Sequence, residues 1–144
     1  MYGDTTAIRA LAARLREQGL EIRAEADTLV GRAEAVSWSG LAADTMRLMS
    51  RQHAGELRTC AALHEEAAEA LDRHAREVEH LQDLIAAVER RVTHLLASAA
   101  GGLGGLVRHL TGHAVPDRVG HWLAHFDPPP HGSKAWLDVH VPSA

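Results

Sequence analysis

Aromatic residues are scarce in this chain, at 3% of its 144 residues. A hydrophobic core must therefore be built mainly from Ala, Leu, Val and Ile, and this composition favours helices. Cysteine is almost absent as well, because Cys60 is the only one. A single cysteine excludes an internal disulfide, and we expect Cys60 to be a small core residue.

An excess of positive charge and long apolar runs are also lacking. The formal net charge is −4, so the chain has no basic footprint for nucleic acid. No apolar run reaches the roughly 18 residues needed to span a bilayer, and we expect no stable membrane span. The first residues, Met1 to Thr6, show no basic region followed by an apolar run, so we expect no ordinary signal peptide.

Motifs of common enzyme classes are missing too. The sequence contains no His-Glu-x-x-His motif, no serine elbow and no phosphate-binding loop. An acidic run from Glu65 to Asp72 precedes Arg73 and Arg76, which indicates a solvated face with ion pairs inside one helix. We therefore predict a protein that is not an enzyme and uses no cofactor.

Helical periodicity is the dominant feature that is present. A first helix is expected to begin at Asp4 or Thr5, since either side chain can cap free N–H groups. Its apolar seam has the alternating spacing of a coiled coil, with large and small residues in turn. The seam consists of Ile8, Leu15, Ile22, Leu29 and Val36, with Ala12, Gly19, Ala26 and Ala33 between them. The small residues would allow a partner backbone to come close.

A second helix is predicted from about Leu41 to about Ser98, after a break at residues 37–40. Its predicted seam includes three histidines: Met46, Ser50, His53, Leu57, Cys60, His64, Ala67, Leu71, His74, Val78, Leu81, Ile85, Val88, Val92 and Leu95. Buried imidazoles would be protonated at low pH and would loosen a dimer. We favour the alternative, in which these histidines lie at the edge of the seam.

The two predicted helices differ in length, at roughly 48 and 85 Å. A short connection makes them antiparallel neighbours, so the first covers the second only to about residue 72. The apolar stripe from His74 to Leu95 then lacks a partner inside the hairpin. We expect either the C-terminal tail or another chain to cover it, because exposing it to water would be costly.

The C-terminal part of the sequence is broken by glycine and proline. Residues 101–105 contain four glycines and are expected to form a hinge, followed by a short amphipathic segment. Another such segment is predicted from Pro116 until residues 128–130, which are prolines. Its apolar residues are Val119, Trp122, Leu123 and Phe126. Residues 135–141 alternate in polarity, which indicates a short extended segment or a disordered end.

The break between the two long helices carries Ser37-Trp38-Ser39-Gly40. A Trp-x-Gly bend between two heptad-repeat helices resembles the WXG family, the early-secreted-antigen-like proteins of type VII (ESX) secretion in actinobacteria and firmicutes. The resemblance implies an all-α fold, with an antiparallel helical hairpin over residues 1–100 that forms a four-helix bundle on dimerisation. Residues 101–144 would be an extension with one or two short helices, which the compact family members lack.

The resemblance also implies roles for particular residues. Trp38 would pack at the end of the bundle and Gly40 would shape the bend, and together they look like half of the family's export signal. The other half, a Tyr-x-x-x-Asp/Glu motif after the second helix, is missing, because the only tyrosine is Tyr2 and Thr6 stands four residues later. The predicted partner-binding face consists of Ile8, Leu15, Ile22, Leu29, Leu57, Leu71, Val78, Leu81 and Ile85.

The preferred function is therefore a non-enzymatic type VII secretion substrate or the partner subunit of one. Its partners would be a second copy or a sister WXG-like protein, together with a secretion ATPase or an effector. Such a protein is cytoplasmic before export and then secreted or held at the cell surface, without a conventional signal peptide. The alternative is a cytosolic adaptor or targeting chaperone for a larger effector or toxin.

A zinc-binding helical module is the second alternative. Histidines four residues apart share a helix face, and two such pairs would supply four ligands. The candidate ligands are His109, His113, His121 and His125. We favour the interpretation that these are surface histidines, since no cysteine or nearby glutamate completes a zinc motif.

Overall fold

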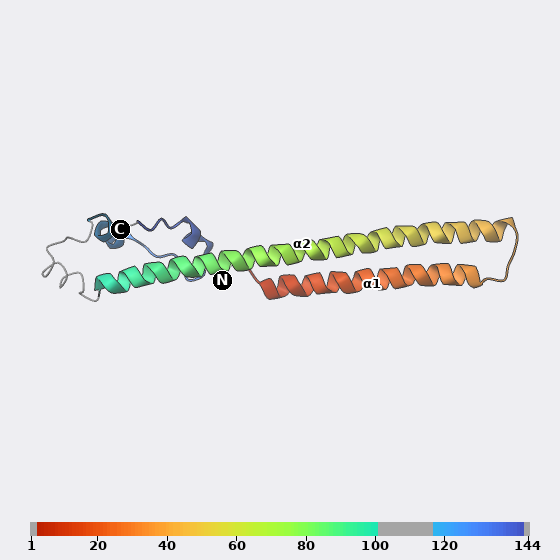
Figure 1. Cartoon of the computed structure of the whole chain (residues 1–144), viewed down its shortest axis with the longest axis horizontal. Helices are drawn as coiled ribbons and strands as arrows, with labels where there is room; N and C mark the ends of the chain where they lie inside the picture. The colour runs from red at the N-terminus through yellow and green to blue at the C-terminus, as the bar shows by residue number, and fades with distance from the viewer. Residues whose placement is uncertain (1–2, 101–116, 143–144) are drawn as a thin grey trace. The chain divides into compact units, whose positions relative to one another are not determined.

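The computed structural model describes residues 3–100 and 117–142. These residues form helices and no strand: α1 (Thr5–Ala35), α2 (Leu41–Ala100), α4 (Asp117–His125) and the 3-10 helix η1 (Lys134–Asp138). Figure 1 shows α1 running alongside α2 as the two arms of a hairpin. The predicted all-α class and helical hairpin are thus confirmed. None of the described helices combines the length and the apolar character that crossing a bilayer requires.

The chain divides into two compact units, Asp4–Glu77 and Met1–Gly3 with Val78–Ala144. The division lies inside α2, whereas the sequence pattern placed it after residue 100. Up to Glu77, α2 packs against α1. Further along α2, Ile85, Val88, Val92 and Leu96 pack against residues 117–142, which we call the C-terminal strap. The expected glycine hinge at 101–105 lies outside the described residues.

Helix α1 begins where its capping residue predicts. The Asp4 carboxylate accepts a hydrogen bond from the Ala7 N–H, at 3.0 Å, and satisfies one of the free donors of the first turn. The helix ends at Ala35, and the backbone of Val36, its C-cap, is extended. Asp4, rather than Thr5, is therefore the cap.

Small residues form the seam between α1 and α2. The buried positions of the hairpin are Ala12, Gly19, Ala26 and Ala33 in α1, and Ala43, Ala54, Ala61, Ala68 and Ala75 in α2. A Cβ atom added to Gly19 would lie 3.3 Å from the carbonyl oxygen of Ala61, so the two backbones are already close. The predicted seam of α1 is confirmed apart from Val36, which is exposed.

One of the two lines predicted for the seam of α2 is wrong along the hairpin. His53, Cys60, Ala67 and His74 are exposed. The alanine that directly follows each of them is buried instead: Ala54, Ala61, Ala68 and Ala75. Because alanine is only weakly hydrophobic, the sequence pattern placed this line of the seam one residue too early. Cys60 is therefore a surface thiol rather than a core residue, 3.9 Å from Nδ1 of the half-buried His64.

Ion pairs join the two arms of the hairpin, among them Arg16–Asp72, Arg23–Glu65, Asp27–Arg58 and Glu34–Arg51. Their members on α2 recur every seven residues, so they lie along one side of that helix. Along each helix, the paired residues are basic first and acidic later in the sequence. Opposite charges therefore meet only when the two helices run antiparallel. Glu65 and Asp72 thus pair across the hairpin, which the expectation of pairs inside α2 missed.

Acid is expected to weaken the hairpin. Hydrogen bonds from Arg23 and Arg16 lower the pKa of Glu65 and of Asp72 below their ordinary values. In the unfolded chain these carboxyls titrate near about 4.3 and about 3.9. Their stabilising contribution is therefore fully present above those values and is lost as pH falls through the lower pKa values of the folded chain.

A carboxyl-carbon NMR titration measures this effect directly. Arg23→Gln is expected to return the pKa of Glu65 towards its ordinary value, because the largest cause of the lowered pKa is the hydrogen bond from Arg23. Arg14→Gln, a change at an exposed position of the same helix, serves as the control. An unchanged Glu65 pKa in Arg23→Gln would show that the pair does not form.

The strap covers the apolar stripe of α2 that the hairpin leaves unpaired. Ile85, Val92 and Trp136 form the buried cluster of this unit. Half-buried residues pack around them: Val88, Leu96, Trp122, Phe126, Leu137, Val139 and Val141. Of the two expected covers, the chain's own tail is thus the one that lies against Ile85 and Val92 in this single chain. Residues 134–138 form η1, and Trp136, which the alternating pattern grouped with polar neighbours, is the buried residue of that helix.

Candidate functional site

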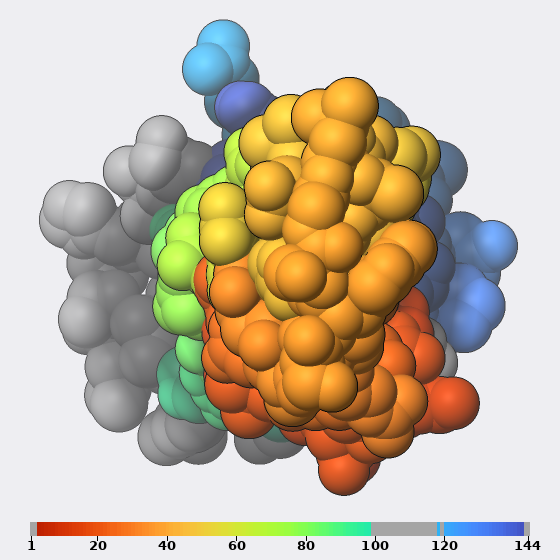
Figure 2. Space-filling model, turned by 90° about the vertical axis from the view of Figure 1, so that its right-hand side faces the viewer, coloured from red at the N-terminus to blue at the C-terminus, as the bar shows by residue number. Residues whose placement is uncertain are grey.

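The bend between α1 and α2 is the best-defined candidate site. Gly40 has a φ of 104°, a backbone conformation that residues with a side chain rarely adopt. Helix α2 begins directly after it, and the Gly40 carbonyl accepts a hydrogen bond from the Asp44 N–H at 3.0 Å. Glycine is therefore needed here to turn the chain into the second helix. Figure 2 looks onto this end of the hairpin, where the residues of the bend face the viewer uncovered.

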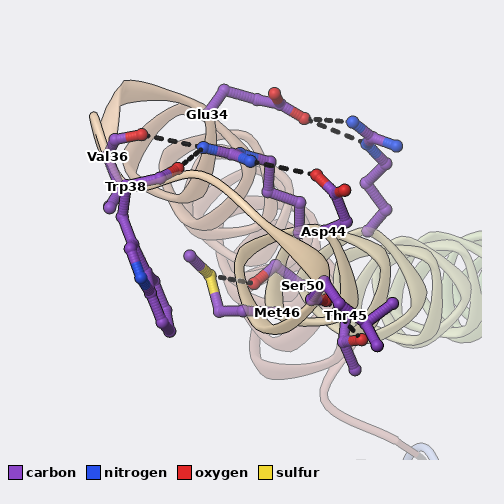
Figure 3. Close-up of polar contacts among 10 residues, drawn as sticks. Glu34, Val36, Trp38, Asp44, Thr45, Met46 and Ser50 are labelled. Atoms are coloured by element: carbon purple, nitrogen blue, oxygen red, sulfur yellow. Dashed lines mark hydrogen bonds and ion pairs between the residues drawn. The ribbon is translucent and has the colours of Figure 1, made fainter.

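Arg47 holds the bend in place from the first turns of α2. Its Nη2 donates to the carbonyl oxygens of Val36 and Trp38, at 2.8 and 2.7 Å, and its Nη1 lies 3.3 Å from a carboxylate oxygen of Asp44 (Figure 3). The Arg47 side chain is only 18% exposed, so these charged hydrogen bonds are partly shielded from water. Sequence reasoning missed this residue, because no local pattern links it to carbonyl groups about ten residues earlier.

The clamped bend presents apolar side chains to solvent. Trp38 is 53% exposed and Leu41 is 85% exposed. Beside them the surface of α2 is hollowed over about 740 Å³, and Leu41, Met46 and Met49 are among the residues that line the hollow. An aromatic ring and flexible methionines next to an open apolar hollow suit contact with another protein.

Replacing Arg47 by alanine is expected to loosen the bend without unfolding the helices. A hydrogen bond from a charged group contributes about 1.5–3 kcal/mol, and the substitution removes both bonds that hold residues 36 and 38. The measurement is the set of ¹⁵N order parameters of residues 36–40, which should fall. Arg32→Ala, an exposed arginine in the last turn of α1, should leave them unchanged. Equal order parameters in Arg47→Ala and the wild type would exclude the clamp.

The residues predicted to bind a partner fall into two groups. Those on the hairpin are only half-buried against the opposite arm: Ile8, Leu15, Ile22, Leu29, Leu57 and Leu71. Those further along α2 lie in the other unit, where Val78 and Ile85 are buried and Leu81 is half-buried. The hairpin group therefore keeps part of its apolar surface exposed, while the second group is largely covered within the chain itself.

Glu89 fastens the strap to α2. Its Oε1 accepts a hydrogen bond from the Gly132 N–H at 2.6 Å, and its Oε2 lies 2.9 Å from Nδ1 of His131. The Glu89 side chain is 12% exposed, whereas that of His131 is almost fully exposed. Nearby, the Trp136 indole N–H donates to the Pro130 carbonyl at 3.0 Å, which holds the strap in its own turn.

The histidine pairs were the candidate metal ligands. His121 and His125 lie on one face of α4, with ring centroids 4.6 Å apart, and Nδ1 of His125 is 3.0 Å from the carbonyl oxygen of His121. His109 and His113 lie outside the described residues. Within residues 3–100 and 117–142, no group of three or more His, Cys, Asp or Glu is arranged to hold a metal ion.

The described parts of the chain thus offer apolar surfaces around a clamped bend and along the hairpin. Such surfaces suit association with another helix rather than binding of a small charged molecule. Comparisons with protein-family models, with curated proteins and with solved structures found no match for this chain.

Proposed function

We propose that this protein acts through helix–helix association, without catalysis, as a type VII secretion substrate or as the partner subunit of one. The observation that carries this proposal is the bend, where Trp38 is half exposed on a turn held by Gly40 and Arg47. A large aromatic side chain on a fixed backbone is typical of a recognition element, because it provides contact area at a small entropic cost. The Trp-x-Gly bend of the WXG proteins has the same order of residues.

The packing of the hairpin supports association as well. Its buried seam consists of Ala and Gly, so the larger apolar residues beside the seam stay half-buried in a single chain. Further apolar side chains, such as Leu20, Leu48 and Leu63, are at least 60% exposed. A second hairpin that covered these residues would complete a four-helix bundle, the usual solution for helices with one apolar face.

Export into the culture medium tests the proposal. The chain is expected in the medium of a host with an active type VII secretion ATPase and absent when that ATPase is inactivated. Trp38→Ala is expected to reduce export at least about tenfold, an effect of about 1.4 kcal/mol on recognition. Leu84→Ala, which truncates a comparably exposed side chain away from the bend, is the matched control.

The identity of the bound protein separates substrate, partner and adaptor roles. Native purification with mass spectrometry is expected to recover a second helical hairpin of similar size or the secretion ATPase, in both cases dependent on Trp38. Recovery of a larger effector alone would favour the adaptor role. Export that does not depend on the ATPase would exclude the proposed function.

A further inference from the structure

The apolar stripe of α2 under the strap has the pattern of a helix–helix interface. Its members alternate at intervals of three and four residues: Val78, Leu81, Ile85, Val88, Val92 and Leu95. Val78, Ile85 and Val92 also continue, every seven residues, the line of α2 that includes Leu57 and Leu71 of the hairpin. The stripe is thus an extension of a surface that α2 already uses to pack against a helix.

The cover on this stripe is light. Among the strap side chains that the structure describes, Trp136 is the only buried apolar one, and α4 and η1 have nine and five residues, too few to be stable helices without tertiary contacts. A hollow of about 300 Å³ remains beside Ile85, Glu89 and Gly132. Opening the strap therefore requires less free energy than unfolding the hairpin, since local units with few buried contacts open first.

The same stripe is complementary to itself. Antiparallel pairing of two copies, centred between residues 86 and 87, sets Val78 opposite Leu95 and Ile85 opposite Val88. Three acidic residues, Glu77, Glu79 and Asp83, precede the centre, whereas Arg90 and Arg91 outnumber the one acidic residue that follows it, Glu89. Antiparallel pairing brings the acidic half of one copy beside the basic half of the other, whereas parallel pairing would set like charges together. In a twofold contact, the same surface of both copies is used, so each copy offers its acidic half to the basic half of the other.

We propose that the strap is an internal cover that competes with a second copy of this chain for the apolar stripe of α2. With the strap closed, Trp136 and its neighbours occupy the stripe and this contact between copies is blocked. With the strap open, residues 78–95 of two chains pair in the antiparallel sense. This regulation rests on the proposed function, since it is a regulation of the helix–helix association proposed there, and Val78, Leu81 and Ile85 belong to the partner-binding face that the sequence predicts.

Sedimentation equilibrium of the full chain tests the competition. Trp136→Ala is expected to raise the association constant at least about tenfold over the wild type, because truncation removes the largest side chain of the cover. Glu89→Ala, which removes the acceptor of the Gly132 N–H without touching the buried cluster, is expected to shift it in the same direction. Unchanged association in both variants would overturn the proposal.

Reversed charges test the register of the pairing. In the Trp136→Ala background, Arg90→Glu with Arg91→Glu is expected to return association to the wild-type level, because both halves of the stripe then become acidic. Arg14→Glu with Arg32→Glu makes the same charge change at exposed positions of α1 and should have no such effect. Equal loss in the two double variants would overturn pairing through the stripe.

The failure of this inference is distinguishable from failure of the proposed function. Export and its dependence on Trp38 report on the bend, and association of Trp136→Ala reports on the strap. Export that persists while Trp136→Ala fails to associate would remove the competition and leave the proposed function standing. Association that depends on the strap, without export, would remove the proposed secretion function and leave the competition standing.

Discussion

Trp136→Ala is expected to open the C-terminal strap while the hairpin stays folded. Trp136 is 5% exposed and is the largest side chain of a cluster whose other buried members are Ile85 and Val92. Truncation of a buried aromatic residue costs about 3–5 kcal/mol, and a small cluster has few other contacts to compensate. The cost is confined to residues 78–142 because the hairpin has its own seam.

Amide hydrogen exchange resolves this local effect. Residues 117–142 should lose protection in Trp136→Ala, residues 78–98 of α2 should become less protected, and residues 5–75 should exchange as in the wild type. Trp38→Ala removes the same ring from an exposed position and should leave all three segments unchanged. Uniform loss of protection along the chain would show that the two units unfold together.

Gly19→Leu is expected to push the two arms of the hairpin apart. Even a single Cβ atom at Gly19 would lie 3.3 Å from the carbonyl oxygen of Ala61 and 3.6 Å from the Cβ of His64. A backbone carbonyl cannot rotate away as a side chain can, so the larger residue requires a shift of a whole helix. Overpacking of this kind costs about 1–3 kcal/mol.

Gly55→Leu provides a control by the same substitution in the same hairpin. Nothing lies within 4 Å of a Cβ added at Gly55, so the change should stabilise α2 by up to about 1 kcal/mol through helix propensity. Urea unfolding followed by circular dichroism measures both effects. A Gly19→Leu variant as stable as Gly55→Leu would show that the arms are not closely packed.

The helices and their bend were predictable because their signals are local. The capping carboxylate of Asp4, the regular spacing of apolar residues and the glycine at position 40 all act within a few residues of where they stand. Periodicity also identified every buried residue of α1, because large residues flank each small one. Both long helices therefore begin and end close to the predicted residues.

Local patterns failed where alanine forms the interface. Along the hairpin, the second line of the α2 seam is Ala54, Ala61, Ala68 and Ala75. Alanine is also common on exposed helix faces. The periodicity therefore fits equally well with Cys60 in the seam as with its neighbour Ala61, which is the buried residue. Which face of α2 is buried depends on how closely α1 approaches, and that distance is a property of the folded pair.

Contacts between distant residues were also beyond sequence reasoning. Three contacts join residues whose separation in the sequence follows no fixed period. Arg23 pairs with Glu65, Arg47 donates to the carbonyls of the bend, and Glu89 accepts from the Gly132 N–H. In each case a charged side chain that looks solvated in the sequence is given a partner by the antiparallel register or by the folded strap. Such pairs are a consequence of the fold and cannot be recognised from the sequence alone.

The sequence by itself determined two long helices, a glycine bend between them and an apolar stripe too long for the first helix to cover. These features depend on backbone propensity and periodicity, which act over one or two turns. Only the tertiary structure decided that alanines form the seam and that the chain's own strap lies on the stripe. Burial is decided by competition among apolar surfaces for one another, and that competition involves residues as far apart as Val92 and Trp136.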